Sequence, residues 1–287
     1  MINHPITDQV RLTDCPRDAM QGLKDFIPTD QKISYLRQLL NVGFDVIDFG
    51  SFVSPAAIPQ LKDTAEVLEQ TDLGETNTKL LAIVGNMRGA QQAVLFSKVS
   101  YLGFPFSVSE TFLRLNIHSD LQKAFTLTTD LIELCDKHRK KLIIYLSMGF
   151  GNPYGDPWSI DMMIDWVGKL HEKGATEINL SDTIGVSTAY TVQTMFNRLI
   201  QGFPEINFGF HLHTAPGQWF DRVDAAWNGG CRSFDGVLAG HGGCPMSGHK
   251  LVGNLGMKDL ISYFDEKKIP LKIDRPLLDE IYMKAPF

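Results

Sequence analysis

The sequence predicts an α/β fold, a closed (β/α)₈ or TIM barrel, on three observations. Eight short segments rich in β-branched and aromatic residues recur along the 287 residues, spaced by about one βα unit. Amphipathic stretches lie between them. Several of the segments, such as LIIYL at 142–146, are apolar throughout, as parallel strands covered on both faces should be. The rival fold, an open doubly wound sheet, is disfavoured because the first βα turn has no GxGxxG.

The predicted strands are, in order, 10–14, 46–52, 80–85, 101–107, 142–148, 177–182, 208–213 and 233–239. The predicted helices with the clearest apolar stripes are 30–41, 161–173, 188–200 and 218–228. From about Met257 onward we expect a final helix and a C-terminal tail. No Pro/Gly/Ser-rich linker divides the chain, so we expect 1–287 to form a single TIM-barrel catalytic domain with a short helical C-terminal extension.

The composition is that of a globular protein, with 44% hydrophobic and 21% charged residues. The net charge of −6 gives no basic footprint for nucleic acid. No apolar run is long enough for a transmembrane helix, and the first residues lack the apolar core of a signal peptide. We therefore expect a cytoplasmic protein without nucleic-acid or membrane partners. Fold-level analogy with other barrels suggests a homodimer.

The four cysteines form no CxxC pair, so we interpret them as free thiols. Cys15, Cys135 and Cys231 are expected to be small buried side chains. Cys244 differs because it ends a glycine-rich segment, Gly-His-Gly-Gly-Cys-Pro, directly after the eighth predicted strand. A thiol there could act as a general acid or nucleophile, and a phosphate-cradling loop with an idle cysteine is the alternative.

Polar residues at the carboxyl ends of barrel strands converge on one mouth, where we expect the active site. This rule selects Arg17, Asp18, Asp48, Asn86, Ser109, Glu110, Ser147, Asp182, His211, His213 and Cys244.

His211-Leu-His213 is the sharpest of these signals. Residues two apart on a strand point the same way, so both imidazoles face one side and can offer neutral nitrogen ligands to a metal. Asp18 would add a carboxylate. The alternative is a pair of hydrogen-bonded barrel histidines. Arg17 beside Asp18 suits a developing enolate oxygen, with a surface ion pair as its alternative.

These motifs together resemble those of the 3-hydroxy-3-methylglutaryl-CoA lyases, barrel metallolyases related to isopropylmalate and homocitrate synthases. The resemblance runs through most of the chain. It rests on CPRDAMQ at 15–21, GSFVSP at 50–55, GNM at 85–87, VSE at 108–110, GNPY at 151–154, SDTIG at 181–185, HLH at 211–213, GGCP at 242–245 and GNL at 253–255.

The resemblance implies retro-aldol (Claisen-type) cleavage of a branched 3-hydroxyacyl-CoA to acetyl-CoA and acetoacetate. It implies that Asp18, His211, His213 and Asn254 hold Mg²⁺ or Mn²⁺. Arg17 would stabilise the enolate, Cys244 would protonate it, and His213, or Asp182 acting through water, would take the hydroxyl proton. The remaining residues implied in substrate positioning are Gln21, Asp48, Asn86 and Ser147.

The chain departs from the family pattern at Ala19, Asp48, Thr214, Pro216, His241 and Lys258, which stand where the family carries Gly, Glu, Asp, Tyr, Leu and Glu. None of these changes removes an implied metal ligand, but several lie close enough to the mouth to alter the acyl group. Two other functions compete. One is a metal-dependent aldolase or condensing enzyme acting on a 2-oxo acid, such as a 4-hydroxy-2-oxo acid aldolase, and the other is a non-enzymatic metabolite sensor.

Overall fold

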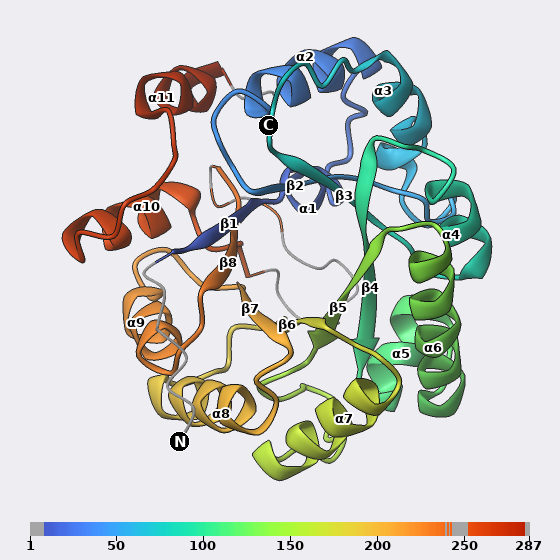
Figure 1. Cartoon of the computed structure of the whole chain (residues 1–287), viewed down its shortest axis with the longest axis vertical. Coiled ribbons are helices and arrows are strands. Elements are labelled where there is room, and N and C mark those ends of the chain that lie inside the picture. Colours follow the sequence, from blue (N-terminus) through green and yellow to red (C-terminus); the bar gives the residue numbers. More distant parts are fainter. Residues whose placement is uncertain (1–8, 239, 241, 243–251, 285–287) are drawn as a thin grey trace.

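The computed structural model describes residues 9–238, 240, 242 and 252–284. Its strands close into a barrel, each pairing in parallel with its neighbours in chain order and the last with the first. Figure 1 looks down this ring and shows the helices outside it. The strands are β1 Arg11–Asp14, β2 Val46–Ser51, β3 Lys79–Ile83, β4 Val99–Ser107, β5 Lys141–Ser147, β6 Glu177–Asp182, β7 Asn207–Leu212 and β8 Ser233–Gly236. The predicted (β/α)₈ barrel is confirmed.

The helices begin where polar side chains cap them. The side chains of Asn86, Ser109, Asp120, Ser159 and Thr188 each accept a backbone N–H of the first turn that no helical carbonyl can bind. The helices are α1 Pro16–Met20, α2 Thr29–Leu39, the 3₁₀ turn η1 Pro59–Leu61, α3 Thr64–Gln70, α4 Met87–Ala93, α5 Glu110–Ile117, α6 Leu121–Lys137, α7 Ile160–Glu172, α8 Ala189–Gly202, α9 Phe220–Asn228, α10 Met257–Glu266 and α11 Arg275–Lys284.

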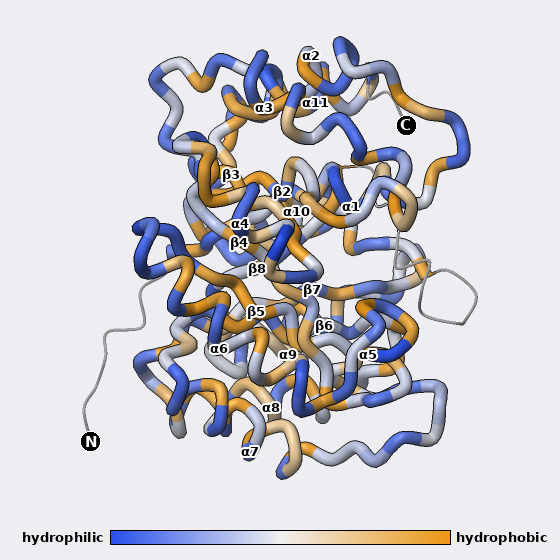
Figure 2. The backbone as a smooth tube through the Cα atoms, turned by 90° about the vertical axis from the view of Figure 1, so that its right-hand side faces the viewer, coloured by the Kyte–Doolittle hydropathy of each residue, from blue (hydrophilic) through white to orange (hydrophobic). Residues whose placement is uncertain are grey.

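The apolar side chains form two layers. A small cluster of Val46, Leu81, Ile143 and Tyr145 lies on the inner side of β2, β3 and β5. A much larger cluster lies between the strands and the surrounding helices. Hydropathy alternates along the helices in Figure 2, as one-sided burial requires. None of the helices in the described part of the chain combines the length and apolar character needed to cross a bilayer.

The predicted strands are all present, and most end within one or two residues of expectation. The eighth is shorter than predicted and ends at Gly236. Beyond it the Val237 amide donates to the carbonyl of Leu255 at 2.9 Å, and Val237 makes only an isolated bridge, to Gly256. Leu255 and Gly256, which follow the glycine-rich segment in the sequence, thus pair with Val237 where a longer β8 was expected.

The C-terminal region corrects one expectation. A single helix and a tail were predicted after Met257, but the structure has two helices, α10 and α11. Asp274 caps α11 by accepting the Leu277 amide at 3.0 Å, and Leu278 and Ile281 are buried in the outer apolar layer. Helix α11 packs beside α2. Helix α11 is buried because it contacts α2, near the other end of the chain, and a local sequence pattern cannot predict a contact between such distant segments.

Candidate active site

A cavity of about 280 Å³ lies at the carboxyl ends of the strands, where the barrel rule placed the site. One wall, from β2 to α5, is largely apolar and includes Val53, Ile83 and Phe112. The other, from β5 to β7, carries hydroxyl and imidazole groups. The cavity is lined by Arg17, Asp18, Gln21, Val53, Ser54, Ala57, Ile58, Ile83, Gly85, Asn86, Pro105, Phe112, Asn116, Ile117, His118, Tyr145, Ser147, Ser181, Thr183, His211 and His213. An apolar acyl chain and a polar reacting centre could therefore be held side by side.

Three predicted metal ligands meet at one point of the cavity wall. The Nε2 atoms of His211 and His213 lie 3.1 Å apart. Oδ2 of Asp18 lies 3.7 Å from each of them. All three side chains are buried, and this carboxylate oxygen has no hydrogen-bond partner among the residues that the structure describes. The sequence signal therefore corresponds to a real convergence of donor atoms.

The outer hydrogen bonds of the two imidazoles assign their tautomers. Nδ1 of His213 lies 2.9 Å from the carbonyl oxygen of Thr183, which can only accept, so Nδ1 carries the proton. Nδ1 of His211 donates to Oδ2 of Asp235 at 3.1 Å. When both imidazoles are neutral, each Nε2 turns a lone pair toward the other, an arrangement that a cation between them would relieve.

The donor set fits a divalent metal. Neighbouring ligands of an octahedral ion with bonds of about 2.1 Å are about 3 Å apart, close to the spacing of the two Nε2 atoms. The unpartnered oxygen of Asp18 supplies the negative charge that such an ion needs. Two imidazoles and one carboxylate leave the remaining positions for substrate and water.

Local structure explains how Arg17 and Asp18 reach the site. Strand β1 ends at Asp14, and Pro16 at the first position of α1 forces the chain into a short helix there. Arg17 is held on one side by Asp48, with Nη2 to Oδ2 at 2.6 Å and Nε to Oδ2 at 3.0 Å. On the other side its Nη1 donates to Oδ1 of Asp18 at 3.1 Å and to Gln21 at 3.0 Å. The guanidinium is thus fixed beside the metal ligands.

Electrostatics keep these groups charged. Burial would raise the pKa of the Asp18 carboxyl, but Arg17 and the two histidines outweigh it and hold that pKa well below its usual range. Burial raises the pKa of Asp48 to about 6 against the opposing effect of Arg17. Burial likewise works against the charged form of His211, yet its pKa is raised because Asp235 and Asp18 stabilise the imidazolium. At neutral pH the site contains ionised Asp18 and Arg17.

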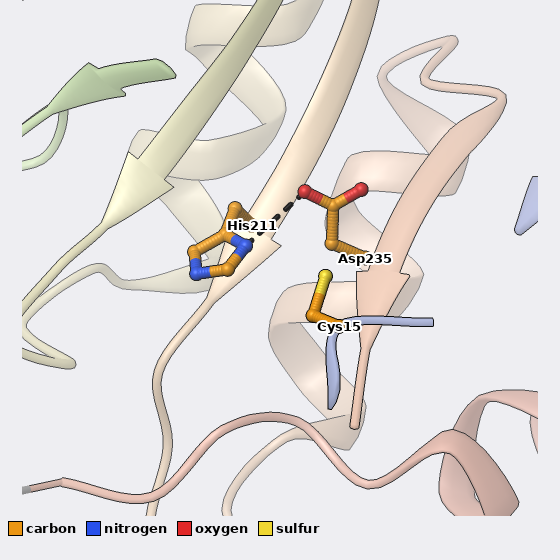
Figure 3. A group of neighbouring side chains, drawn as sticks. All are labelled: Cys15, His211 and Asp235. Carbon is orange, nitrogen blue, oxygen red and sulfur yellow. Dashed lines mark hydrogen bonds and ion pairs between the residues drawn. The ribbon is translucent and has the colours of Figure 1, made fainter. Parts of the chain in front are cut away.

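A second group of possible metal ligands, Cys15, His211 and Asp235, lies beside the first and shares His211 with it. Figure 3 shows that the shared imidazole turns Nδ1 toward Asp235, with the Cys15 thiol next to that carboxylate. Burial raises the pKa of Cys15 well above its ordinary value, so the thiol stays protonated. We therefore assign the first group as the candidate metal site and Asp235 as a partner of its histidine.

The residues expected to position substrate divide into two sets. Gln21, Asn86 and Ser147 line the cavity, although the Asn86 side chain also caps α4. Asp48 is fully buried behind Arg17 and is absent from the cavity wall. Asp182 also faces away from the cavity. Its two carboxylate oxygens accept the amides of Val186 and Ser187, both at 2.9 Å.

The placement of Asp182 follows from strand geometry. Its neighbours Ser181 and Thr183 line the cavity, so the alternation of side chains turns Asp182 the other way. His213, the other expected base, donates from Nδ1 to Thr183 and turns Nε2 to the metal ligands. Asp182 is therefore turned away from the cavity, whereas His213 lines the cavity and has only Nε2 free of the Thr183 contact.

Asn254 lies next to the metal ligands through the backbone. It forms an isolated antiparallel bridge with His213, and the flanking Leu255 amide donates to the carbonyl of Leu212 at 3.0 Å. Asn254 is buried, as a ligand position requires. Cys244 and His241 lie outside the described residues.

The other sequence departures lie at different distances from the site. Lys258 pairs with Asp279 at 2.6 Å and lies over the ring of Tyr282, so it ties α10 to α11 and leaves the cavity untouched. Thr214 is buried directly after His213 and accepts a hydrogen bond from Arg222 at 3.3 Å.

Cys15, Cys135 and Cys231 are free and buried, as expected.

Sequence reasoning missed several residues of the site. Tyr145 and Ser181 line the cavity, and their hydroxyl groups are buried without a hydrogen-bond partner within the described ranges. Tyr145 lies two residues before Ser147 on β5, and Ser181 is in register with His211 of β7. Each therefore points to the same side as a residue that the strand-end rule selected. Applying the two-residue alternation one step deeper than the strand ends would have found Tyr145. Asp235 has the same explanation, since it is in register with His211.

Comparison with known proteins identifies the family of this chain. The HMGL-like family model matches residues 9–281. The hydroxymethylglutaryl-CoA lyase of Bacillus subtilis is 30% identical over 258 residues, which are 90% of this chain and 85% of the relative. A Pseudomonas aeruginosa 3-hydroxy-3-isohexenylglutaryl-CoA/hydroxymethylglutaryl-CoA lyase is 30% identical over 271 residues, 93% of this chain and 88% of the relative.

Solved structures give the same relationship. An HMG-CoA lyase from Acinetobacter baumannii in complex with coenzyme A and 3-methylmalate superposes with a TM-score of 0.90 at 29% identity, covering 97% of this chain and 90% of that one. The HMG-CoA lyase of Bacillus subtilis also gives 0.90 at 29% identity, over 98% and 94% of the two chains.

Proposed function

This chain belongs to the HMGL-like family and is a carbon–carbon lyase, and we propose that it cleaves 3-hydroxy-3-methylglutaryl-CoA, or a thioester with a similar 3-substituent, to acetyl-CoA and acetoacetate. The bond between C2 and C3 breaks. The electron pair of the O–H bond becomes the second bond between C3 and oxygen in the ketone of acetoacetate, and the pair of the C2–C3 bond becomes the enolate of acetyl-CoA. One proton leaves the hydroxyl, and one is added to the enolate carbon.

The convergence of Asp18, His211 and His213 beside Arg17 on the cavity wall is the observation that carries this proposal. With Asn254 next to them, these residues would hold the metal, Mg²⁺ or Mn²⁺. When bound, a divalent ion supplies positive charge that makes a tertiary hydroxyl group easier to deprotonate. A carboxylate and a hydroxyl oxygen are the donors that a hard divalent ion held by these residues would take from the substrate.

Arg17 stabilises the enolate that forms as the bond breaks. Its guanidinium is fixed by Asp48 before substrate arrives, so no reorganisation is needed when negative charge develops on the thioester oxygen. A preorganised donor of this kind interacts more strongly with the enolate than with the ground-state carbonyl, which is the condition for lowering the barrier.

The two proton steps are assigned to water and to Cys244. Because both oxygens of Asp182 accept backbone amides and Nε2 of His213 is assigned to the metal, the hydroxyl proton would pass to a water molecule of the cavity. Cys244 then protonates the enolate carbon and regains its proton from solvent. The apolar wall around Val53, Ile83 and Phe112 holds the acyl and thioester carbon chain away from water.

A coupled assay for acetoacetate release from 3-hydroxy-3-methylglutaryl-CoA tests the proposal. We expect turnover with Mg²⁺ or Mn²⁺, no turnover after EDTA treatment, and recovery when metal is restored. A thioester with a longer 3-alkyl group, assayed in parallel, separates a wrong acyl group from a wrong reaction. A 4-hydroxy-2-oxo acid serves as the substrate of the competing aldolase. Cleavage of that acid alone, or EDTA-resistant turnover, would overturn the proposal.

A further inference from the structure

Three buried side chains from three successive strands form a hydrogen-bonded chain that ends at the candidate metal site. Nδ2 of Asn179, in β6, donates to Oδ2 of Asp235, in β8, at 3.0 Å. The same Oδ2 accepts from Nδ1 of His211, in β7, at 3.1 Å. Asn179 and Asp235 are 1% and 2% exposed, and neither lines the cavity. The hydrogen-bonded chain therefore reaches His211 from the side away from the cavity, and Figure 3 shows its last link, from His211 to Asp235.

A glycine makes this chain possible. Gly209 of β7 is in register with Asn179, between it and the strand that carries Asp235. A Cβ atom at Gly209 would lie 2.3 Å from Oδ1 of Asn179, far inside contact distance. The amide of Asn179 thus occupies the space that a side chain at Gly209 would need. Only because this space is free can Asn179 reach across β7 to Asp235.

The carboxylate of Asp235 has few other partners. Its second oxygen, Oδ1, is buried and accepts no hydrogen bond from the described residues. Its near neighbour Cys15 is held as a neutral thiol by its burial, and its Sγ makes only a weak contact of 3.9 Å with the carbonyl of Thr13. The negative charge of Asp235 is therefore directed to His211, with Asn179 fixing the oxygen that accepts from it.

We propose that Asp235 and Asn179 are positioning residues of the metal site, with Asp235 holding the ring and tautomer of His211 and Asn179 holding Asp235. Carboxylates behind metal-ligating histidines orient the ring and increase the basicity of the nitrogen that binds the ion, and their loss weakens metal affinity by about 10–100-fold. His213 has only the neutral carbonyl of Thr183 in the equivalent place. The inference rests on the metal site of the proposed function.

The test is calorimetric titration of the full chain, first stripped with EDTA, with Mn²⁺ as the probe. Asp235→Leu should weaken Mn²⁺ binding by about 10–100-fold. In Asp235→Asn the amide oxygen can accept both hydrogen bonds, so geometry is kept, charge is lost and the weakening should be below about 10-fold. This partial rescue by the conservative variant separates positioning from mere loss of packing. Asp14→Asn is the control for losing a buried carboxyl group elsewhere in the barrel, and its Mn²⁺ affinity should match the wild type.

A double-mutant cycle tests the hydrogen bond between Asn179 and Asp235. Asn179→Ala and Gly209→Ala should each weaken Mn²⁺ binding several-fold, because both remove the same hydrogen bond to Asp235. The double variant should then be no weaker than either single variant. The electron paramagnetic resonance spectrum of bound Mn²⁺ should broaden in Asp235→Leu and remain close to wild type in Asp14→Asn.

The outcomes are distinct. Unchanged Mn²⁺ affinity in folded Asp235→Leu overturns the positioning role, and additive losses in the cycle overturn the part assigned to Gly209. If wild-type protein binds no Mn²⁺, the positioning role and the metal-dependent function are both wrong. If the wild type binds Mn²⁺ and the variants behave as expected but no thioester is cleaved, only the proposed function is overturned.

Discussion

Asp48→Ala tests the claim that Asp48 acts through Arg17. In the structure Asp48 makes the shortest contact of the guanidinium, at 2.6 Å, and two more at 3.0 Å and 3.3 Å. The two side chains are only 10% and 1% exposed. Without Asp48 the buried guanidinium keeps Asp18 and Gln21 as its hydrogen-bond partners among the described residues. Breaking a buried pair of this kind destabilises a protein by about 3–5 kcal/mol.

The expected effect on activity follows from the same contacts. Freed from Asp48, Arg17 should turn further toward Asp18 and away from the enolate oxygen, and loss of one preorganised donor lowers kcat by about 10²–10³-fold. Urea denaturation would measure the stability loss, and acetoacetate release at saturating metal and thioester would measure kcat. Asp48→Asn, which keeps one acceptor for the guanidinium, should lose less of both.

The decisive comparison is with Arg17→Met. If Asp48 acts only by holding Arg17, the double variant should have the same kcat as Arg17→Met alone. Multiplicative losses would show that Asp48 has a role of its own. A kcat at the wild-type level in folded Asp48→Ala would refute the reasoning altogether.

Three further predictions address the metal, the acid and pH. Mn²⁺ at a hundred times its Kd should raise the free energy of unfolding by about 2.7 kcal/mol in the wild type and by almost nothing in His211→Ala. Equal stabilisation of both proteins in thermal melts would exclude this histidine as a ligand. Cys244→Ser should lower kcat by about 10²–10⁴-fold, the range of general acid catalysis, with unchanged Mn²⁺ affinity, and a fully active variant would remove Cys244 from the mechanism. Burial raises the pKa of Asp14 from 3.8 to about 8, so the folded protein keeps a proton that the unfolded chain has released. The stability that Asp14 contributes is therefore complete only below about pH 4 and is lost as the pH rises toward 8. Between pH 5 and 8, Asp14→Asn should gain up to about 1.4 kcal/mol per pH unit relative to the wild type in urea denaturation, and a pH-independent difference would contradict this assignment.

The sequence by itself determined the barrel and predicted the three side chains that converge at the candidate metal site. Eight apolar segments with helical stretches between them specify β and α locally, through side-chain periodicity that needs no knowledge of distant contacts. His211 and His213 were predictable as a pair because two-residue spacing on a strand fixes a common direction. Asp18 followed from the rule that the ends of barrel strands share one mouth, which holds for any closed parallel barrel.

Only the tertiary structure decided what lies behind those ligands. Asp48 supports Arg17 instead of lining the cavity, and Asp182 binds two amides of its own loop. Asp235 reaches His211 because β7 and β8 pair in one particular register. Asn179 reaches Asp235 because Gly209 leaves space between them. These relations depend on which residues face each other across strands far apart in the chain, and a single strand's periodicity carries no information about its neighbour's register.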